Sequence, residues 1–168
     1  SVSVAEGKTA IMEETVTLGG VCEKNGSGAL ILGGGVKFYD AEKNVAVDTP
    51  NGASLKILQG ALGVASSDAL KGVALTFANG AKLLSSVEGS GIVLDSAPVI
   101  EGEMLEVEIV EWPDSGIVPL NLFRLPATEV LDASKFHIVG KAGYKVGEVK
   151  SRIDGECVVY YSSVTKLG

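Results

Sequence analysis

The residues that come closest to a catalytic spacing are glutamates in the segment 101–112, chiefly Glu106 and Glu108, with Glu103 and Glu111 beside them. Apolar residues alternate with Glu106 and Glu108, so the pattern predicts a half-buried strand with both carboxylates on its solvent face. Strand geometry separates two such side chains by about 6.6–7 Å, a spacing that suits acid–base chemistry on a sugar. A charged outer strand face explains the glutamates without chemistry, and we favour that interpretation.

Sugar-binding sites also use aromatic rings as platforms, and this chain is poor in them. Outside phenylalanine, the candidates are Trp112, Tyr39, Tyr144, Tyr160 and Tyr161. The core must therefore consist mainly of Val, Leu, Ile and Ala, which suit narrow, regular, layered interiors. Few large rings remain to line a ligand cleft.

Other catalytic arrangements lack required residues. His137 is the one histidine, and its alternation with Phe136 and Ile138 predicts that it faces solvent, so a nucleophile–histidine arrangement is not expected. The glycines Gly26, Gly28 and 33–35 match neither phosphate-binding fingerprint, and no helix is predicted after them. We predict no catalytic residue and no cofactor-binding residue, and therefore a protein that is not an enzyme.

Metal ligands and disulfides are also weakly indicated. Asp40, Glu42 and Asn44 alternate and could share one face, but they lack the spacing of an acidic calcium loop, so a solvated turn is the preferred interpretation. Cys22 and Cys157 lie near opposite ends of the chain. A bridge between them would close a very long loop; two separate, small apolar core residues are favoured. No metal site is predicted.

Length and charge restrict the class of protein. The chain has 168 residues, enough for one domain with a sizeable core, and a formal net charge of −7. Such a surface repels phosphate backbones, and lysine and arginine form no cluster, so nucleic-acid binding is not expected. No apolar run reaches the ~18 residues of a membrane span. Because the chain begins with Ser1 and shows no leader, we expect a fragment or a mature form.

Short β-prone runs, punctuated by glycine, asparagine and aspartate, dominate the first hundred residues. Asn25-Gly26, Asn51-Gly52 and Asn79-Gly80 accept a positive φ and mark tight turns; Asn25-Gly26-Ser27 also matches a glycosylation sequon, which we interpret as a turn. One short helical turn is predicted at residues 66–71. Strands near ten residues apart, with small residues between them, favour a parallel β-helix over the alternative, a β-sandwich.

The character of the sequence changes after Ser96. Longer, alternating and more charged strands follow, with a hairpin turn predicted at 153–156. We therefore divide the chain into β-helix repeats at 1–96 and an antiparallel C-terminal cap at 97–168, which together form one continuous domain. Such a cap would protect the open strand edges of the stack.

Residues 19–33 read Gly-Gly-Val-Cys-Glu-Lys-Asn-Gly-Ser-Gly-Ala-Leu-Ile-Leu-Gly. This segment resembles the autotransporter-associated β-strand repeat of bacterial surface and secreted proteins, in which a unit reads roughly Gly-Gly-Leu-Thr-Lys-Thr-Gly-Ser-Gly-Thr-Leu-Thr-Leu-Ser-Gly. Cys22, Glu23 and Ile31 depart from the small polar residues usual there. The segment 70–83 looks like the strand–Asn-Gly-Ala–strand units of the same family.

The resemblance implies a right-handed β-helix passenger segment, exported from a Gram-negative-like cell to its surface or the extracellular space. The function expected is structural or adhesive and non-catalytic, with a host or cell-surface protein or glycan as partner. Two alternatives stay open: a carbohydrate-active β-helix enzyme of the polysaccharide lyase or hydrolase kind, and a β-sandwich binding module. A sandwich would pair strands antiparallel across Asn25-Gly26 and Asn79-Gly80, whereas a β-helix would stack them in parallel.

Overall fold

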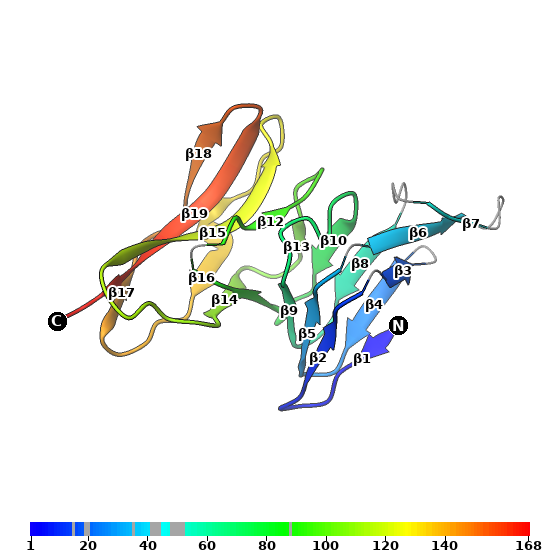
Figure 1. Ribbon diagram of the computed structural model, residues 1–168, viewed down its shortest axis with the longest axis horizontal. Coiled ribbons are helices and arrows are strands. Elements are labelled where there is room, and N and C mark those ends of the chain that lie inside the picture. The colour runs from blue at the N-terminus through cyan, green and yellow to red at the C-terminus, as the bar shows by residue number, and fades with distance from the viewer. Residues whose placement is uncertain (15, 19–20, 35, 41–44, 48–52, 88) are drawn as a thin grey trace.

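The structure of the protein is a computed structural model of residues 1–168 (Figure 1). It describes the chain apart from residues 15, 19–20, 35, 41–44, 48–52 and 88. Side chains are described outside 15–20, 35–52 and 88. The described fold is all-β, with parallel sheets and one short 3₁₀ helix, η1 (Ala133–Lys135).

Two parallel sheets form the body of the molecule. Sheet A has the spatial order β1 (Val2–Ser3), β4 (Val21–Asn25), β8 (Ser54–Ile57), β10 (Ala74–Phe77) and β13 (Val99–Ile100). Sheet B has the order β2 (Thr9–Met12), β5 (Ala29–Leu32), β9 (Ala61–Val64), β11 (Lys82–Ser85), β14 (Leu105–Ile109) and β16 (Phe136–Ile138). All neighbouring strands within these two sheets are parallel.

The chain visits the two sheets alternately, first sheet A and then sheet B, and we call one such passage a rung. The strand pairs β1–β2, β4–β5, β8–β9, β10–β11 and β13–β14 are successive rungs. Equivalent residues of neighbouring rungs lie about 20 positions apart where the connection is short, as for Ser54 and Ala74. Longer connections are inserted elsewhere, and the stacking resumes after them in the same order.

Two further sheets lie outside sheets A and B. β3 (Val16–Leu18) pairs in parallel with β6 (Val36–Asp40), which pairs antiparallel with β7 (Val45–Val47). The C-terminal sheet has the order β12 (Ile92–Val93), β15 (Ile117–Pro126), β19 (Cys157–Lys166) and β17 (Tyr144–Val146), with β18 (Lys150–Asp154) also on β19. In Figure 1 this sheet and the first rungs occupy opposite sides, and the two termini lie far apart.

The core is mainly aliphatic, with a few buried phenylalanines, and on sheet B its side chains form a ladder from strand to strand. On sheet B, Leu30, Leu62, Leu83 and Val107 are direct neighbours across four strands, and each is at most 2% exposed. The alternation in β14 predicts this inward face correctly, because Leu105, Val107 and Ile109 are buried and the glutamates between them are not. Burial on this scale is the main stabilising contribution to such a fold.

Two of the Asn-Gly dipeptides are corners and not hairpin turns. Asn25-Gly26 and Asn79-Gly80 lie between a strand of sheet A and a strand of sheet B, and Gly26 and Gly80 have φ values of 78° and 88°. The strands on either side of each dipeptide pair with the neighbouring rungs in parallel. The antiparallel pairing that a β-sandwich predicts at these dipeptides is therefore not the observed arrangement. Asn51-Gly52 lies outside the described residues.

Lys24 lies in the inward column of sheet A, between Val2 and Ile57 of the neighbouring strands. Its residue is 0% exposed. The ammonium Nζ donates to the carbonyl oxygens of Gly26 at 2.7 Å, Gln59 at 2.8 Å and Asn25 at 3.2 Å. Burial lowers the pKa of Lys24 because the charged form loses solvation. This one charge therefore joins the corners of two consecutive rungs.

The change in composition after Ser96 does not coincide with a change in strand pairing. β13 and β14 continue sheets A and B in parallel, and the antiparallel pairing of the C-terminal sheet begins only with β15 and β19. The predicted hairpin turn at 153–156 is present: β18 and β19 are antiparallel, and Gly155 has a φ of 63°.

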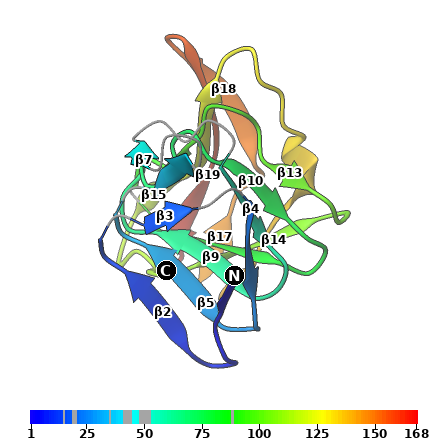
Figure 2. The ribbon, with the colours of Figure 1, turned by 90° about the vertical axis from the view of Figure 1, so that its right-hand side faces the viewer.

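The last strand of sheet A is covered by side chains. Lys135 Nζ donates to the Ile100 carbonyl at 3.3 Å, and the Ala97 N–H donates to a Glu129 carboxylate oxygen at 2.9 Å. Figure 2 shows η1 and its flanking segment beside β13. Edge strands need such protection because their backbone groups are otherwise open to pairing.

The prediction of a helical turn at residues 66–71 is wrong. This segment makes separate turn bonds, from Ala69 N–H to Ser66 O and from Lys71 N–H to Asp68 O, without forming a helix. A helix needs several residues to be fixed before its first bond forms, and so short a segment does not offset that cost. Ala69 and Leu70 are buried in the core instead.

Candidate functional site

The paired glutamates lie together on the outer face of sheet B, where they share one lysine. Lys82 Nζ is 3.1 Å from a carboxylate oxygen of Glu106 and 3.1 Å from one of Glu108. The register places Lys82 beside Glu106 and Glu106 beside His137. His137 is exposed, as its alternation with Phe136 predicts. The sequence therefore predicts the shared face, and the parallel register supplies the lysine.

The shared contacts raise the pKa of Lys82, first through the hydrogen bond to Glu106 and then through that to Glu108. A raised pKa keeps the ammonium protonated, so Lys82 is a poor general base. Both carboxylates contact the same ammonium at the same distance, so the geometry gives them one common charge partner and not two different environments. This arrangement does not have the electrostatic asymmetry that sugar hydrolysis requires.

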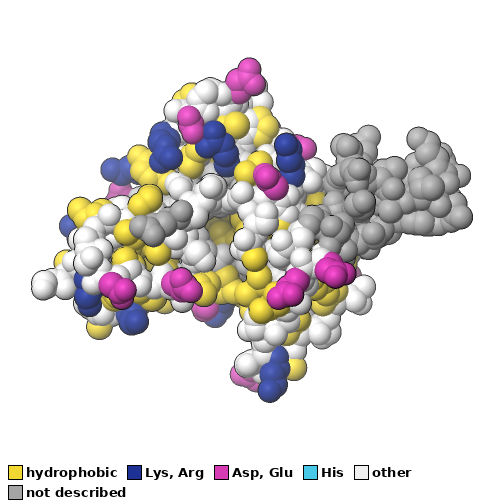
Figure 3. Space-filling model, in the orientation of Figure 1, with side chains coloured by type: hydrophobic (Ala, Val, Ile, Leu, Met, Phe, Trp, Pro, Cys, Tyr) yellow, Lys and Arg dark blue, Asp and Glu magenta, His cyan; other side chains and the backbone are white. Residues whose placement is uncertain are grey.

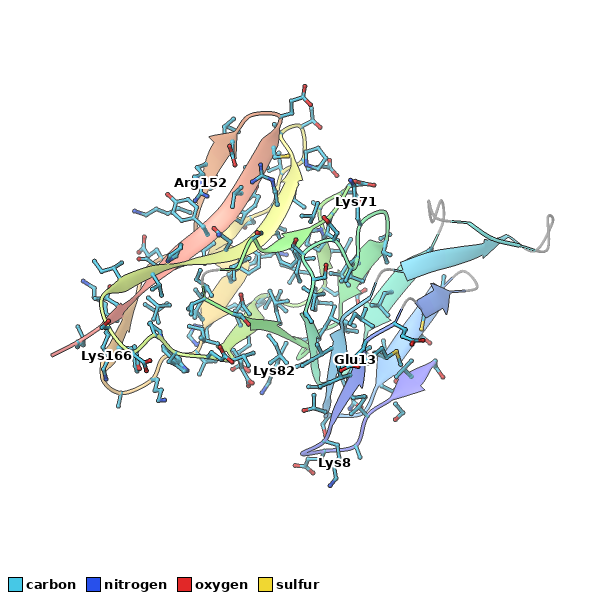
Figure 4. All side chains as sticks on the ribbon, in the orientation of Figure 1. Lys8, Glu13, Lys71, Lys82, Arg152 and Lys166 are labelled. Atoms are coloured by element: carbon cyan, nitrogen blue, oxygen red, sulfur yellow. The ribbon has the colours of Figure 1, made fainter. Side chains whose placement is uncertain are left out.

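A hollow of about 580 Å³ adjoins this face at the corner between sheets A and B. It is lined by Asn79, Gly80, Ala81, Glu101, Gly102, Glu103, Met104 and Glu106. Glu101 pairs with Lys56 at 3.2 Å, so carboxylates and lysines do meet there. Figure 4 labels Lys82 on the outer side of sheet B, next to this corner.

A second cavity, of about 340 Å³, lies between sheet B and the C-terminal sheet. Among the described residues, the lining has no charged side chain and consists of Val64, Ala65, Ser67, Leu83, Leu84, Ser85, Ser86, Gly89, Ser90, Gly91, Ile92, Asn121 and Leu122. Figure 3 shows a hollow near the centre of the molecule, where β12 and β15 meet in Figure 1. Groups of this kind can position a ligand but offer no acid, base or strong nucleophile.

Asn121 is the notable residue of this cavity. Its Nδ2 donates to the Gly89 carbonyl at 2.8 Å, and its Oδ1 is buried without a hydrogen-bond partner among the described residues. A β-bulge interrupts the pairing of β15 with β19 between Asn121 and Phe123. An unpaired buried acceptor costs about 1–3 kcal/mol. Sequence reasoning missed this residue, because nothing in the chain's pattern marks a bulge.

Two of the predicted aromatic platforms come together at the C-terminal end. The ring centroids of Trp112 and Tyr144 are 4.7 Å apart with an interplanar angle of 47°. Lys141 Nζ lies 5.9 Å from the Trp112 ring centroid and 5.7 Å from that of Tyr144, and Lys166 Nζ lies 4.6 Å from the Tyr144 centroid. The sequence supplies the ring types, but their contact depends on the tertiary fold.

The remaining aromatic candidates do not join that pair. Tyr160 is buried, and its hydroxyl accepts a hydrogen bond from the Leu131 N–H at 2.8 Å. Tyr161 is half-buried under the guanidinium of Arg152, 4.8 Å from its ring centroid. The side chain of Tyr39 lies outside the described residues.

Glu103 and Glu111 are exposed. Glu103 lines the corner hollow, whereas Glu111 precedes Trp112. The structure therefore brings Glu103 to the same hollow as Glu106, whereas Glu111 does not line that hollow.

Cys22 and Cys157 are free thiols, and both are half-buried. The two cysteines are separate, as predicted; Cys22 packs against the core as expected, whereas Cys157 is not among the residues packed against it. Within the described ranges, no group of three or more His, Cys, Asp or Glu side chains could hold a metal ion. Glu42, Asn44 and the side chain of Asp40 lie outside those ranges.

Comparison with protein-family models, with curated proteins and with solved structures finds no match. Among the helical residues that the structure describes, no helix is long and apolar enough to span a membrane.

Proposed function

We propose that this chain is a non-catalytic segment of an exported bacterial surface protein, built as a right-handed parallel β-helix that presents its outer face to a partner. The partner would be a host or cell-surface protein or glycan, and the protein would act at the cell surface or outside the cell. The alternating visits to sheets A and B and the continuous aliphatic ladder support the stacked scaffold. The resemblance of residues 19–33 to passenger repeats supports the setting.

One observation carries the non-catalytic part of the proposal: Lys82 binds both Glu106 and Glu108 on an exposed sheet face. A catalytic pair needs two carboxyl groups in different environments, so that one holds a proton and the other does not. Here both carboxylates contact the same ammonium, each at 3.1 Å, so their surroundings are alike. A cross-strand ion pair on a solvated sheet is the role that these distances support.

The first experiment measures turnover. The protein is incubated with polygalacturonate and with a β-glucan, and both reducing ends and the ultraviolet absorbance of unsaturated uronates are followed. We expect no release above the rate of a heat-denatured sample. Turnover that Glu106→Gln abolishes and Glu111→Gln preserves would refute the non-catalytic proposal.

The second experiment measures adhesion to glycoprotein surfaces. Beads coated with the protein are applied to immobilised mucin-type glycoprotein, to its deglycosylated form and to albumin. We expect retention on at least one of the two glycoprotein surfaces and none on albumin. Equal retention on all three surfaces, or none on any, contradicts the adhesive part of the proposal.

A second candidate function, a carbohydrate-active enzyme, is favoured by the corner hollow alone. There Glu101, Glu103 and Glu106 line one space of about 580 Å³, and Lys56 and Lys82 contact two of them. The turnover experiment decides between the two functions, because Glu106 belongs to the hollow and Glu111 does not.

A further inference from the structure

We propose that Trp112, Tyr144, Lys141 and Lys166 form a binding site for a negatively charged sugar residue. We call this group the aromatic–lysine cluster. The inference deepens the proposed display function by naming a ligand class and a place, and it rests on that function.

The cluster assembles from segments far apart in the sequence. Trp112 follows the end of β14, Tyr144 begins β17, and Lys166 ends β19 directly opposite Tyr144 in the antiparallel register. Lys141 lies in the turn before β17, and its carbonyl oxygen accepts a hydrogen bond from the Tyr144 N–H at 3.1 Å. Figure 4 labels Lys166 near the end of the C-terminal sheet, well away from Lys82.

The two rings are held in place before any ligand arrives. Both are half-buried and pack against the hydrophobic core. The Tyr144 hydroxyl donates to the Pro113 carbonyl at 2.8 Å, and Pro113 is buried. A rigid ring loses little conformational entropy on binding, which is why such groups serve as anchors.

The cluster carries positive charge on a protein whose net charge is −7. Lys141 and Lys166 are exposed, and among the described residues neither forms an ion pair. Glu111 and Asp114 flank Trp112 and Pro113 in the chain, but both are exposed and neither binds these lysines. Two ammonium groups near one ring repel each other, and an anion between them would relieve that repulsion.

The combination selects a ligand that has both an apolar face and a negative charge. Sugar rings present C–H faces that pack on aromatic rings, and a carboxylate or sulfate group would accept charge-assisted hydrogen bonds from the lysines. A neutral sugar would leave the ammonium groups without a partner, and a simple anion would leave the rings uncovered. The long, exposed lysine side chains can move off the ring faces without disturbing the core.

The test uses the indole N–H signal of Trp112, which is unique because the chain has one tryptophan. The ¹⁵N-labelled protein is titrated with glucuronate, glucose 6-sulfate, glucose, acetate and a short acidic peptide. We expect glucuronate, the sulfated sugar or both to shift this signal in the millimolar range, and glucose and acetate to bind at least about fivefold more weakly. Comparing the two charged sugars distinguishes carboxylate from sulfate recognition.

The variant Lys141→Met/Lys166→Met should lose the response to the charged sugar. The matched control, Lys8→Met/Lys71→Met, removes two exposed lysines outside the cluster and should keep it. The ¹H–¹⁵N signals of residues outside the cluster, compared between each variant and the wild type, check that a loss of binding is not a loss of fold. High salt should weaken the wild-type response, because exposed charges are screened.

Several results would overturn the inference. Equal affinity for glucose and glucuronate would remove the role of the lysines, and equal affinity for acetate would show an anion contact without ring recognition. Tighter binding of an acidic peptide would assign the cluster to a protein partner. If the cluster ignores charged sugars while coated beads still bind glycoprotein, the cluster is wrong and the display function stands; if no surface is bound, the display function itself fails.

Discussion

Replacing Lys24 with methionine tests whether the buried ammonium stabilises or destabilises the stacked strands. Lys24 lies in the inward column of sheet A, and its three acceptors are the carbonyls of Asn25, Gly26 and Gln59. The Asn25 carbonyl also accepts from the Val4 N–H at 3.1 Å. The substitution therefore affects mainly Gly26 and Gln59.

The magnitude follows from two opposing effects. Each hydrogen bond from a charged donor contributes about 1.5–3 kcal/mol, whereas burying an ion costs several kcal/mol. Methionine is apolar and fits the column, but it leaves the carbonyls of Gly26 and Gln59 without this donor. Water replaces part of the loss at Gln59, whose residue is exposed. We expect Lys24→Met to lower the free energy of unfolding by about 2–4 kcal/mol.

The assay is urea unfolding followed by far-ultraviolet circular dichroism and by Trp112 fluorescence, since one probe reports the strands and the other the C-terminal end. Lys8→Met is the matched control, because Lys8 is exposed. The control should stay within about 0.5 kcal/mol of the wild type. A Lys24→Met protein as stable as the wild type, or more stable, would refute the reasoning.

The pH dependence provides an independent check. Burial lowers the pKa of Lys24 below its ordinary value of 10.5. Between the folded and the unfolded pKa, the unfolded chain binds more protons, so this group makes stability rise with pH in that window. The stability of the wild type relative to Lys24→Met should therefore increase as the pH approaches 10.5. A difference that falls over this range contradicts burial as the cause.

Three further substitutions test the corners, the ladder and the outer face. In the same urea assay, Gly60→Ala should lower the free energy of unfolding by several kcal/mol more than Gly80→Ala. Both glycines have a positive φ, so the backbone strain of an alanine is similar at the two positions. A Cβ at Gly60 would lie 2.2 Å from the Gly28 carbonyl oxygen, whereas a Cβ at Gly80 meets nothing within 4 Å. Similar losses for the two would contradict the close approach at that corner. Leu83→Ala should lower the free energy of unfolding by about 2–5 kcal/mol, because it opens a cavity in the ladder. A loss no larger than that caused by truncating an exposed side chain would show that the ladder is not packed. Lys82→Met should lower the free energy of unfolding by less than about 1 kcal/mol, because Lys82 and its two partners are partly open to solvent. Thermal unfolding at low and high salt checks this, and a loss above about 2 kcal/mol would mean that the outer ion pairs are structural.

Local rules predicted much of the strand content. Period-two alternation placed Glu106, Glu108 and His137 on the outer face, and the structure confirms all three. Asn-Gly dipeptides predicted the tight corners at Gly26 and Gly80. These features depend on a few neighbouring residues, and such residues determine side-chain direction and turn conformation.

Local sequence rules did not predict which strands pair with one another. The composition change after Ser96 suggested a cap, yet β14 remains in sheet B and pairs with β11 in parallel. The Asn121 bulge arises from the pairing of β15 with β19. Loop closure costs little more for a long connection than for a short one, so spacing along the chain does not decide which strands meet.

By itself, then, the sequence determined that this is a glycine-punctuated, all-β protein with an aliphatic interior and glutamates on an outer strand face. Only the tertiary structure placed Lys24 inside the stack, gave Glu106 and Glu108 one shared lysine, and brought Trp112 against Tyr144. The physical reason is that the direction of a side chain follows from its own strand. Its solvation, charge partners and ring contacts follow from strands elsewhere in the sequence.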